Sequence, residues 1–410
     1  MKKLICLLSV FLFLCGCGAD TLEKSGVAES LESSSVTIEE PDVYLDADGK
    51  LCFGDTQFKT KRDLWLLAYV EDRIYFKIQD PDDEQRVTIY KADLNAHEIT
   101  AVGIIEHYRI STRPHDVRRI DQKLYFTVAC DEEKGGKVHE TLFSIDLVTD
   151  TLHTYEGERL ISPLVYHQTY GGKLFTLKTK AVDGYYTSYI EKFDPAENTA
   201  ETILSEKIAD ILAFTVDNGL LYLMEKNEQE RWELLRYDLD GVLQNRFDLS
   251  DAQEDMGDYK IAQICVTNGY FLVSNLIEMK IFKILDDTLH LVANGWASEF
   301  YTANYNEKLP EENIFIYSAR EQTFLFNPIE ATLSQLVLPF IKYPETQIVT
   351  EAFESDGTVL LCISDIMANK SSYYILPEEK LKEFVVQTNR IKDEEVLHFL
   401  GEKEEVIIIE

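Results

Sequence analysis

A strand-like segment recurs seven times along this chain at nearly constant spacing, and this repeat constrains the fold more than any motif does. Each copy is a short apolar and aromatic run entered by a tight turn, as in DNGLLY at 217–222 and TNGYFL at 267–272. Aligned on one apolar position, the copies are 50, 50, 47, 50, 44 and 44 residues apart: Ile74, Leu124, Leu174, Leu221, Phe271, Phe315 and Val359. Periods of about 40 to 50 residues made of strands are typical of the blades of a β-propeller.

Four strands can be assigned within each repeat, most clearly in the fourth copy. There the expected strands are 209–216, 219–226, 232–239 and 242–249. They are rich in Val, Ile, Tyr and Phe, and turn residues such as Asn218-Gly219 and Asp240-Gly241 separate them. This pattern predicts an antiparallel four-stranded blade.

The third strand of most repeats ends in an apolar residue followed by Asp or Asn. The pairs are Ala92-Asp93, Ile145-Asp146, Phe193-Asp194, Tyr237-Asp238 and Phe326-Asn327. An Asx side chain at this place can accept hydrogen bonds from backbone amides two residues on and so open a hairpin. We therefore interpret these residues as structural and not as catalytic acids.

The two ends of the chain suggest how the blades close into a ring. The last internal blade ends with strands at 372–377 and 380–386. What remains matches a first and second strand at the C-terminus and a third and fourth strand near the N-terminus: 394–402, 404–410, 42–49 and 50–55. The sequence thus predicts an all-β fold, a single propeller of eight blades whose last blade joins both termini, because closure protects sheet edges. Seven blades are the alternative, and two β-sandwiches are a third.

The first 17 residues carry an export signal. Lys2 and Lys3 precede an apolar run from Leu4 to Leu14, too short to span a membrane, and Leu14-Cys15-Gly16-Cys17 follows. This ending is similar to the lipobox of bacterial lipoproteins, which implies that Cys17 takes the diacylglycerol. The alternative is an ordinary cleaved signal with an incidental cysteine.

Residues 17–42 are expected to form a flexible tether, because they are rich in Ser and Glu and almost lack aromatic residues. The predicted organisation is therefore a signal peptide at 1–16, the tether at 17–42 and the propeller at 43–410.

From these features the chain resembles the lipid-anchored bacterial β-propellers whose blades carry a DGxIYF and LYxxDL type of pattern, here seen as DRIYF at 72–76 and LLRYDL at 234–239. The resemblance implies a propeller exported and held by lipid on the outer face of the cytoplasmic membrane, or in the outer membrane of a double-membraned host. Many such proteins have no assigned activity, so it implies no reaction.

The charge of the chain excludes some partners. The formal net charge is −33, from 40 basic and 73 acidic residues. Such an excess of acid repels phosphate backbones and anionic lipid heads, which argues against nucleic-acid binding and against docking on the membrane other than by the lipid. We expect a monomer.

Motifs for catalysis and for metals are mostly missing from the sequence. His97 and His139 are each followed by Glu but lack the second histidine of a zinc motif, and there is no GxSxG, P-loop or CxxC pattern. No cofactor is expected; calcium at 80–84 or 46–49 is a weak alternative to a solvated turn. Four cysteines of the expected propeller, Cys52, Cys130, Cys265 and Cys362, are interpreted as small buried residues, with two disulfides as the alternative.

Two clusters are candidate binding sites on the face where chain connections between blades emerge. The first is a basic patch for an anionic ligand: Lys59, Lys61, Arg62, Arg109, Arg113, His115, Arg118 and Arg119. The second is an aromatic platform for a sugar or peptide: Trp296, Phe300, Tyr301 and Tyr305. Neutralised charges and core aromatics are the alternative interpretations.

The sequence thus favours a non-enzymatic binding or scaffold module for an envelope protein or a surface glycan. One alternative is a hydrolase or lyase with an active site in the central channel, assembled from single residues of several strands. Another is a structural subunit of an envelope transport complex. Three or more convergent carboxylates or histidines would favour catalysis.

Overall fold

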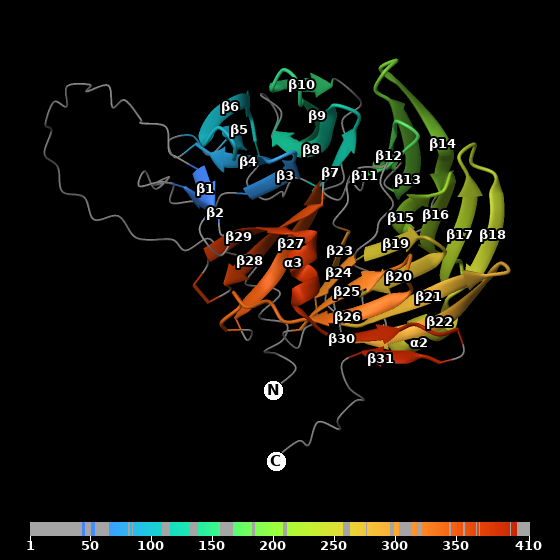
Figure 1. Ribbon diagram of the computed structural model, residues 1–410. Helices are drawn as coiled ribbons and strands as arrows, with labels where there is room; N and C mark the ends of the chain where they lie inside the picture. The colour runs from blue at the N-terminus through green and yellow to red at the C-terminus, as the bar shows by residue number, and fades with distance from the viewer. Residues whose placement is uncertain are drawn as a thin grey trace, which may run out of the picture. The chain divides into compact units, whose positions relative to one another are not determined.

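The computed structural model describes 20 stretches of the chain, all within one compact unit, Glu40–Glu410 (Figure 1). They are residues 43–45, 51–53, 65–80, 83, 85–108, 115–131, 138–155, 167–182, 185–207, 211–256, 263–275, 277–295, 299–302, 314–317, 322–343, 346–355, 357–365, 367–368, 370–393 and 395–399. The signal peptide, Cys17 and the whole of the expected tether lie outside them. No helix in these stretches is long and apolar enough to span a membrane.

Seven antiparallel sheets follow one another in chain order, which we number 1 to 7. Sheet 1 contains β3 (Trp65–Val70), β4 (Arg73–Gln79), β5 (Val87–Asp93) and β6 (Glu98–Ile105). Sheet 2 contains β7 (His115–Ile120), β8 (Lys123–Asp131), β9 (Val138–Asp146) and β10 (Thr151–Tyr155). Sheet 3 contains β11 (His167–Tyr170), β12 (Lys173–Val182), β13 (Tyr185–Asp194) and β14 (Thr199–Lys207). Sheet 4 contains β15 (Ile211–Asp217), β16 (Leu220–Lys226), β17 (Trp232–Asp238) and β18 (Leu243–Asp248).

The remaining sheets vary this scheme. Sheet 5 contains β19 (Gln263–Thr267), β20 (Tyr270–Ser274), β21 (Met279–Leu285) and β22 (Thr288–Gly295), and sheet 6 contains β23 (Glu299–Thr302), β24 (Ile314–Tyr317), β25 (Thr323–Asn327) and β26 (Thr332–Leu336). Sheet 7 has three strands, β27 (Gln347–Ser355), β28 (Thr358–Asp365) and β29 (Lys370–Pro377). Helix α2 (Ser250–Met256) connects sheets 4 and 5, and α3 (Glu378–Glu383) follows sheet 7.

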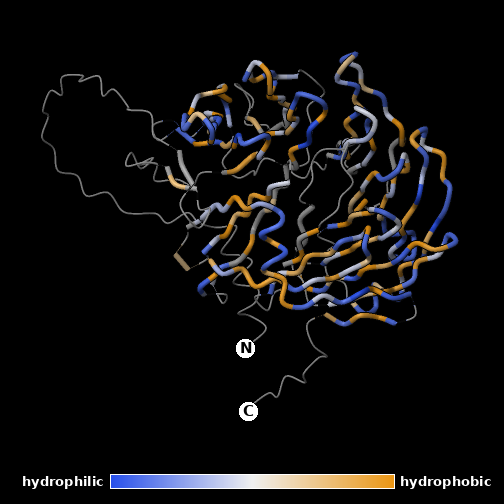
Figure 2. Tube along the Cα trace, in the orientation of Figure 1, coloured by the Kyte–Doolittle hydropathy of each residue, from blue (hydrophilic) through white to orange (hydrophobic). Residues whose placement is uncertain are grey.

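Apolar clusters between consecutive sheets hold this arrangement together. Alternation of hydrophobic and hydrophilic residues along the strands (Figure 2) leaves each sheet with side chains to bury on its neighbours. One apolar cluster lies between each two consecutive sheets, beginning with sheets 1 and 2 and ending with sheets 6 and 7. A further cluster packs Tyr69 and Phe76 of sheet 1 against Leu360 and Ile375 of sheet 7. The chain is therefore a closed, nearly all-β propeller, as the repeat predicts.

The closure differs in one respect from the predicted joining of the two termini. The N-terminal strands β1 (Val43–Leu45) and β2 (Leu51–Phe53) pair with each other, and β2 lies beside β29 of sheet 7. The C-terminal β31 (Leu397–Phe399) pairs instead with β22, in parallel, as a fifth strand of sheet 5. The predicted pairing of these two ends in one eighth blade was wrong for the described residues, and the seven large sheets correspond to the alternative. Residues 404–410 lie outside the described stretches.

The segment after sheet 7 also pairs in an unexpected place. The sequence predicts that 380–386 forms the fourth strand of the last blade, but most of this segment forms α3, and β30 (Val385–Arg390) then pairs with β26 of sheet 6. Residues 378–399, here named the strap, thus run backward along the outer strands of sheets 6 and 5. Leu381, Ile391 and Phe399 of the strap are buried, so it is packed into the propeller and not merely laid on it.

The predicted Asx turns are confirmed. Asp93, Asp146, Asp194 and Asn327 each accept hydrogen bonds from the backbone N–H groups two and three residues on, at 2.8 to 3.3 Å. Asp238 accepts bonds from the N–H groups of Asp240 and Val242. These Asp and Asn side chains open the hairpins to the fourth strands, which is the structural role that the sequence indicates.

Cys130, Cys265 and Cys362 are buried in sheets 2, 5 and 7, and Cys52 is half-buried in β2. The first three contribute to apolar clusters with aliphatic and aromatic side chains. The interpretation of these three as small core residues is therefore confirmed.

Candidate functional site

The turns between the first and second strands, here named the inner turns, form the most regular polar feature of the propeller. They lie at 71–72, 121–122, 171–172, 218–219 and 268–269, and a further one ends at Gly357. Asn218 and Gly219 both have positive φ, 47° and 75°, as do Asn268 and Gly269 at 47° and 77°. Two consecutive positive φ values are the mark of the type I′ turn, which Asn-Gly favours. The sequence pattern at these turns therefore predicts their backbone correctly.

The inner turns of neighbouring sheets lie close together because their first strands are adjacent. Strand β7 lies beside β11, β11 beside β15, β15 beside β19, and β27 beside β3. Across the junction of sheets 1 and 2, Arg119 Nη2 lies 2.9 Å from Glu71 Oε1, and Arg119 Nε donates to the backbone oxygen of Asp121 at 3.0 Å. The turns thus form a connected surface on a rigid frame.

Tyr170 is an exposed aromatic residue at one of the described inner turns. It is the last residue of β11, and 37% of its surface is exposed. A Cβ atom at Gly219 of the next sheet would lie 3.3 Å from the Tyr170 hydroxyl, so the two sheets meet closely at this point. A ring that is half in contact with protein and half in solvent suits the binding of a sugar or a peptide group.

Asp217, two residues before Gly219 in the chain, supplies an unusual carboxyl group. It ends β15, where it is half-buried, and burial raises its pKa to about 6. A hydrogen bond from Asn218 Nδ2 to Asp217 Oδ2, at 3.0 Å, opposes that rise in part. A carboxyl group with such a pKa exchanges protons near neutral pH, so it can act as a hydrogen-bond donor or acceptor toward a ligand.

The predicted basic patch is only partly described. Lys59, Lys61, Arg62, Arg109 and Arg113 lie outside the described residues, and His115 begins β7 but its side chain is not described. Arg118 and Arg119 lie at the other end of β7, next to the inner turn, since Ile120 pairs with Lys123 of β8. Arg118 donates to the backbone oxygen of Val117 at 3.1 Å, and Arg119 pairs with Glu71. These two arginines therefore belong to the inner-turn surface and not to the opposite end of the strand, where the connection enters.

For the predicted aromatic platform, the structure describes the backbone of two residues, Phe300 and Tyr301. Phe300 and Tyr301 lie in β23, opposite Ile316 and Phe315 of β24, so they belong to a first strand and not to a loop. Trp296 and Tyr305 lie outside the described residues.

The weak calcium candidate at 80–84 falls in the β4–β5 hairpin. There the Asp83 carboxylate accepts a hydrogen bond from the backbone N–H of Gln85 at 2.9 Å, and the Asp80 carboxylate lies 4.0 Å from Arg86 Nη1. Within the described stretches, no three His, Cys, Asp or Glu side chains are grouped so that they could hold a metal ion.

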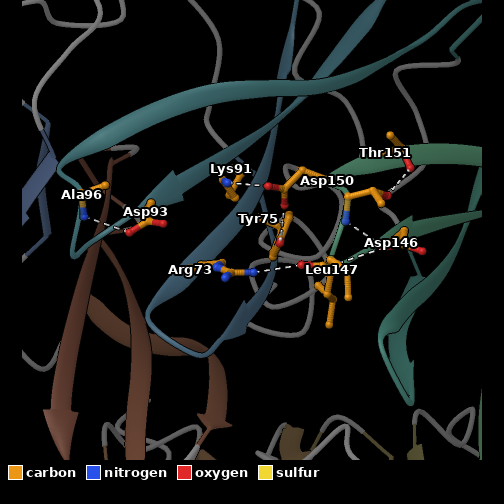
Figure 3. Close-up of polar contacts among 11 residues, drawn as sticks. Arg73, Tyr75, Lys91, Asp93, Ala96, Asp146, Leu147, Asp150 and Thr151 are labelled. Carbon is orange, nitrogen blue, oxygen red and sulfur yellow. Dashed lines mark hydrogen bonds and ion pairs between the residues drawn. The ribbon is translucent and has the colours of Figure 1, made fainter.

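A repeated cluster of tyrosine, a basic residue and aspartate joins neighbouring sheets, and it was not predicted from the sequence. In the first instance Tyr75 and Lys91 of sheet 1 contact Asp150, in the β9–β10 turn of sheet 2 (Figure 3). Lys91 Nζ lies 2.5 Å and the Tyr75 hydroxyl 3.1 Å from the carboxylate oxygens. Arg73 donates to the backbone oxygen of Leu147 in the same turn at 2.9 Å. Burial raises the pKa of Tyr75, which keeps its hydroxyl a donor to Asp150.

The same arrangement recurs at two other junctions. Arg236 of sheet 4 lies 2.7 Å from Asp287 of sheet 5, and Lys283 of sheet 5 lies 2.6 Å from Asp393 of the strap. Tyr222 and Tyr270 are the cross-strand neighbours of these two basic residues. Each basic residue stands two positions before the last residue of its third strand. An alignment of the repeats could therefore have identified these residues. These clusters are structural, because their charges are paired within the frame.

Comparisons with known proteins identify a fold and no family. No protein-family model and no curated protein matches the chain. Among solved structures it is similar to a puromycin hydrolase, with a TM-score of 0.51 and 8% identity over 81% of this chain and 53% of that chain. It is also similar to a prolyl endopeptidase, with a TM-score of 0.48 and 12% identity over 80% of this chain and 55% of that chain. A third similar structure is the β-propeller domain of the Trilobed protease from Pyrococcus furiosus, with a TM-score of 0.44 and 12% identity over 70% of this chain and 86% of that chain. The chain spans about half the length of the first two, and likeness at this identity is one of fold alone.

Proposed function

We propose that this chain is a lipid-anchored, extracytoplasmic propeller that binds a partner protein or a surface glycan with its inner-turn surface. The observation that carries the proposal is the exposure of Tyr170 where it meets Gly219, the residue that ends the turn after Asp217 and Asn218 of the next sheet. Loops and turns on a rigid scaffold are where binding residues concentrate. Here an aromatic ring, an amide and a carboxyl group are presented together, which suits a polar ligand such as a glycan or a peptide.

The frame beneath the surface supports binding without rearrangement. Arg119 is held by Glu71 and by the backbone oxygen of Asp121, and its side chain is only 13% exposed. The turn residues themselves are fixed by positive φ angles and by pairing of the flanking strands. A surface ordered before binding loses less conformational entropy when it binds.

Anchoring rests on the lipobox and is tested separately. Replacing Cys17 with Ala removes the thiol that would take the lipid, so we expect an unprocessed or released protein. Fractionation of the membranes, with a Cys15→Ala variant as the matched control, measures this. Normal processing and membrane retention of the Cys17→Ala variant would overturn the anchor but not the binding surface.

Site-directed photocrosslinking tests the binding surface. A photoreactive phenylalanine analogue at Tyr170 is compared with the same analogue at Tyr343, an exposed tyrosine of the segment after β26. We expect a covalent adduct to one envelope protein or to a glycan from position 170 only. The proposal fails if the two positions give the same adducts or if only position 343 gives one.

A hydrolase or lyase is the second candidate, favoured by the pKa of Asp217 near 6, since such a carboxyl group can serve as a general acid. Substrate screening with the native protein and the Asp217→Asn variant distinguishes the two functions. A turnover that depends on Asp217 would favour catalysis over binding.

A further inference from the structure

The strap adds strands to two sheets that have a full set of strands without it. Sheets 5 and 6 each contain four strands of their own, as sheets 1 to 4 do, and the strap adds β31 and β30 to their outer edges (Figure 1). Strand β31 has three residues, and β30 pairs with β26 alone. The strap is therefore an addition to the frame of seven sheets and not one of its blades.

Sheet 6 lacks a turn aspartate that is present at two other junctions. At the junctions of sheets 1 and 2 and of sheets 4 and 5, Asp150 or Asp287 of the later sheet pairs with a basic residue of the earlier one. Each of these aspartates is the last residue of the turn between the third and fourth strands, with a positive φ of 53° or 63°. In sheet 6 the last residue of that turn is Ala331, with φ 54°. Ala331 packs against the apolar cluster between sheets 5 and 6, but its methyl group cannot pair with a cation.

The strap supplies the carboxylate that this turn lacks. Ile391 donates its N–H to the backbone oxygen of Ala331 at 2.8 Å, which holds the strap beside the turn. Two residues later, Asp393 Oδ1 lies 2.6 Å from Nζ of Lys283, the basic residue of sheet 5. Asp393 thus does for Lys283 what Asp150 does for the basic residue of sheet 1, and we name this contact the clasp.

The rest of the strap is held at the surface of the propeller. The side chains of β30 are exposed or half-buried, and the buried residues among those described in the strap are Leu381, Ile391 and Phe399. Strand β20 in the middle of sheet 5, by contrast, is buried along its whole length. Segments with few buried apolar residues and with backbone hydrogen bonds near solvent open at a lower free energy than the core does. The strap therefore has the character of a segment that opens before the sheets do.

We propose that the strap is a latch, which opens and closes as a unit while the seven sheets stay folded, with Asp393 as its clasp on Lys283. Opening uncovers the outer strands β26 and β22 and leaves each sheet with its own strands. This latch is independent of the inner turns and of the lipid, and so of the proposed function.

Hydrogen exchange of the full chain, resolved to single amides by fragmentation and mass spectrometry, measures the opening. Two amides report on the closed strap: Ile391 donates to Ala331, and Val337 of the frame donates to the backbone oxygen of Phe384 at 3.0 Å. We expect both amides to exchange at one common rate, faster than the amides of β20 and β24, the second strands of sheets 5 and 6. The latch is overturned if the reporters exchange as slowly as those strands, because the strap then opens only when the protein unfolds.

Asp393→Asn tests the clasp, with Asp150→Asn as the matched control in the cluster between sheets 1 and 2. Removing the charge from a half-exposed ion pair should speed exchange of both reporter amides about two- to fivefold. The control variant should leave both rates unchanged, because Asp150 lies in the frame. Equal effects of the two variants, or no effect of Asp393→Asn, would contradict the clasp.

Ala331→Asp supplies a readout that a merely destabilised variant cannot imitate. It places a carboxyl group in the turn itself, at a positive φ that Asp tolerates better than Ala. This second carboxylate competes with Asp393 for Lys283, so we expect faster exchange of the Ile391 amide together with an undiminished thermal midpoint. Unchanged or slower exchange of that amide would show that Asp393 is not the clasp.

Discussion

The hydroxyl groups of Tyr69 and Thr358, 289 residues apart in the chain, lie 2.9 Å from each other. Tyr69 belongs to β3 of sheet 1, and Thr358 begins β28 of sheet 7. The hydroxyl of Tyr69 also donates to Asp72 Oδ1 at 3.2 Å. This bond, together with the apolar cluster between sheets 1 and 7, closes the propeller by packing and not by a blade shared between the termini.

Replacing Tyr69 with Phe should therefore weaken the closure without leaving a cavity. The change removes the hydroxyl and leaves the Thr358 side chain without this bond, so we expect a loss of about 1 kcal/mol in the free energy of unfolding. Denaturant unfolding measures the loss. Tyr343→Phe, at a tyrosine that is 57% exposed, is the matched control and should change little. Equal effects at both positions would argue against a role for Tyr69 in closure.

The strap should contribute strongly to stability through Phe399. This side chain is 4% exposed, packs against Phe324 with ring centroids 5.6 Å apart, and lies over Gly295, where a Cβ atom would meet its backbone oxygen at 2.2 Å. Truncating a buried Phe to Ala costs about 3 kcal/mol or more. The thermal midpoint of Phe399→Ala should thus fall by several degrees, while that of His398→Ala, an exposed neighbour, should fall much less.

A chain terminated after Phe399 extends this test. If residues 43–53 and 404–410 formed a shared blade, removing the last residues would destabilise the protein strongly. Because the C-terminal strand β31 pairs with β22 and not with β1 or β2, we expect this truncation to cost less than Phe399→Ala does. A larger loss on truncation would instead favour the eight-bladed closure.

The sequence predicts those parts of the fold that depend on local chemistry. Asn218-Gly219 needs its turn type because of its own backbone preferences, and Asp146 binds the amides that directly follow it. The partner strand of β30, by contrast, is not determined by local chemistry. Val385 and Val386 favour a strand, but the choice of β26 as partner depends on which sheet edge is open after folding, and no local pattern contains that information. The same holds for Asp150, whose partner Lys91 comes from the preceding sheet.

The candidate site was predictable to a lesser degree, for the same physical reason. Asp217 belongs to a turn that the sequence identifies, but its raised pKa comes from burial by its neighbours. Arg118 and Arg119 were identified as candidate binding residues around β7, but which end of the strand they occupy depends on the register of β7 against β8.

Replacing Asp217 with Asn should stabilise the protein at neutral pH. The pKa of this carboxyl group is raised from its ordinary 3.8 to about 6 by burial, so the folded state binds its proton more tightly than the unfolded state does. Native stability therefore falls as pH rises from 4 to 6 and stays lower above 6. Removing the charge should gain about 1 kcal/mol at pH 8, after allowance for partial solvent exposure, and little at pH 4. Thermal unfolding at both pH values measures the difference; a gain that does not depend on pH would exclude this explanation.

Asp194→Asn should show the opposite dependence on pH. The ion pair with Lys173, followed by the N–H groups of Ala196 and Glu197, holds the pKa of Asp194 below its ordinary value. Its contribution to stability is therefore present above pH 3.8, the ordinary value, and is lost as pH falls through the lowered pKa of the folded state. Asn keeps an oxygen for the two N–H groups, so the variant isolates the charge and its pair with Lys173. We expect a small fall in the thermal midpoint at pH 7 that vanishes once the pH falls below the lowered pKa of Asp194, measured beside Asp217→Asn. If both variants shifted the midpoint in the same direction at pH 7, the assignment of opposite pKa shifts to these two carboxyl groups would be wrong.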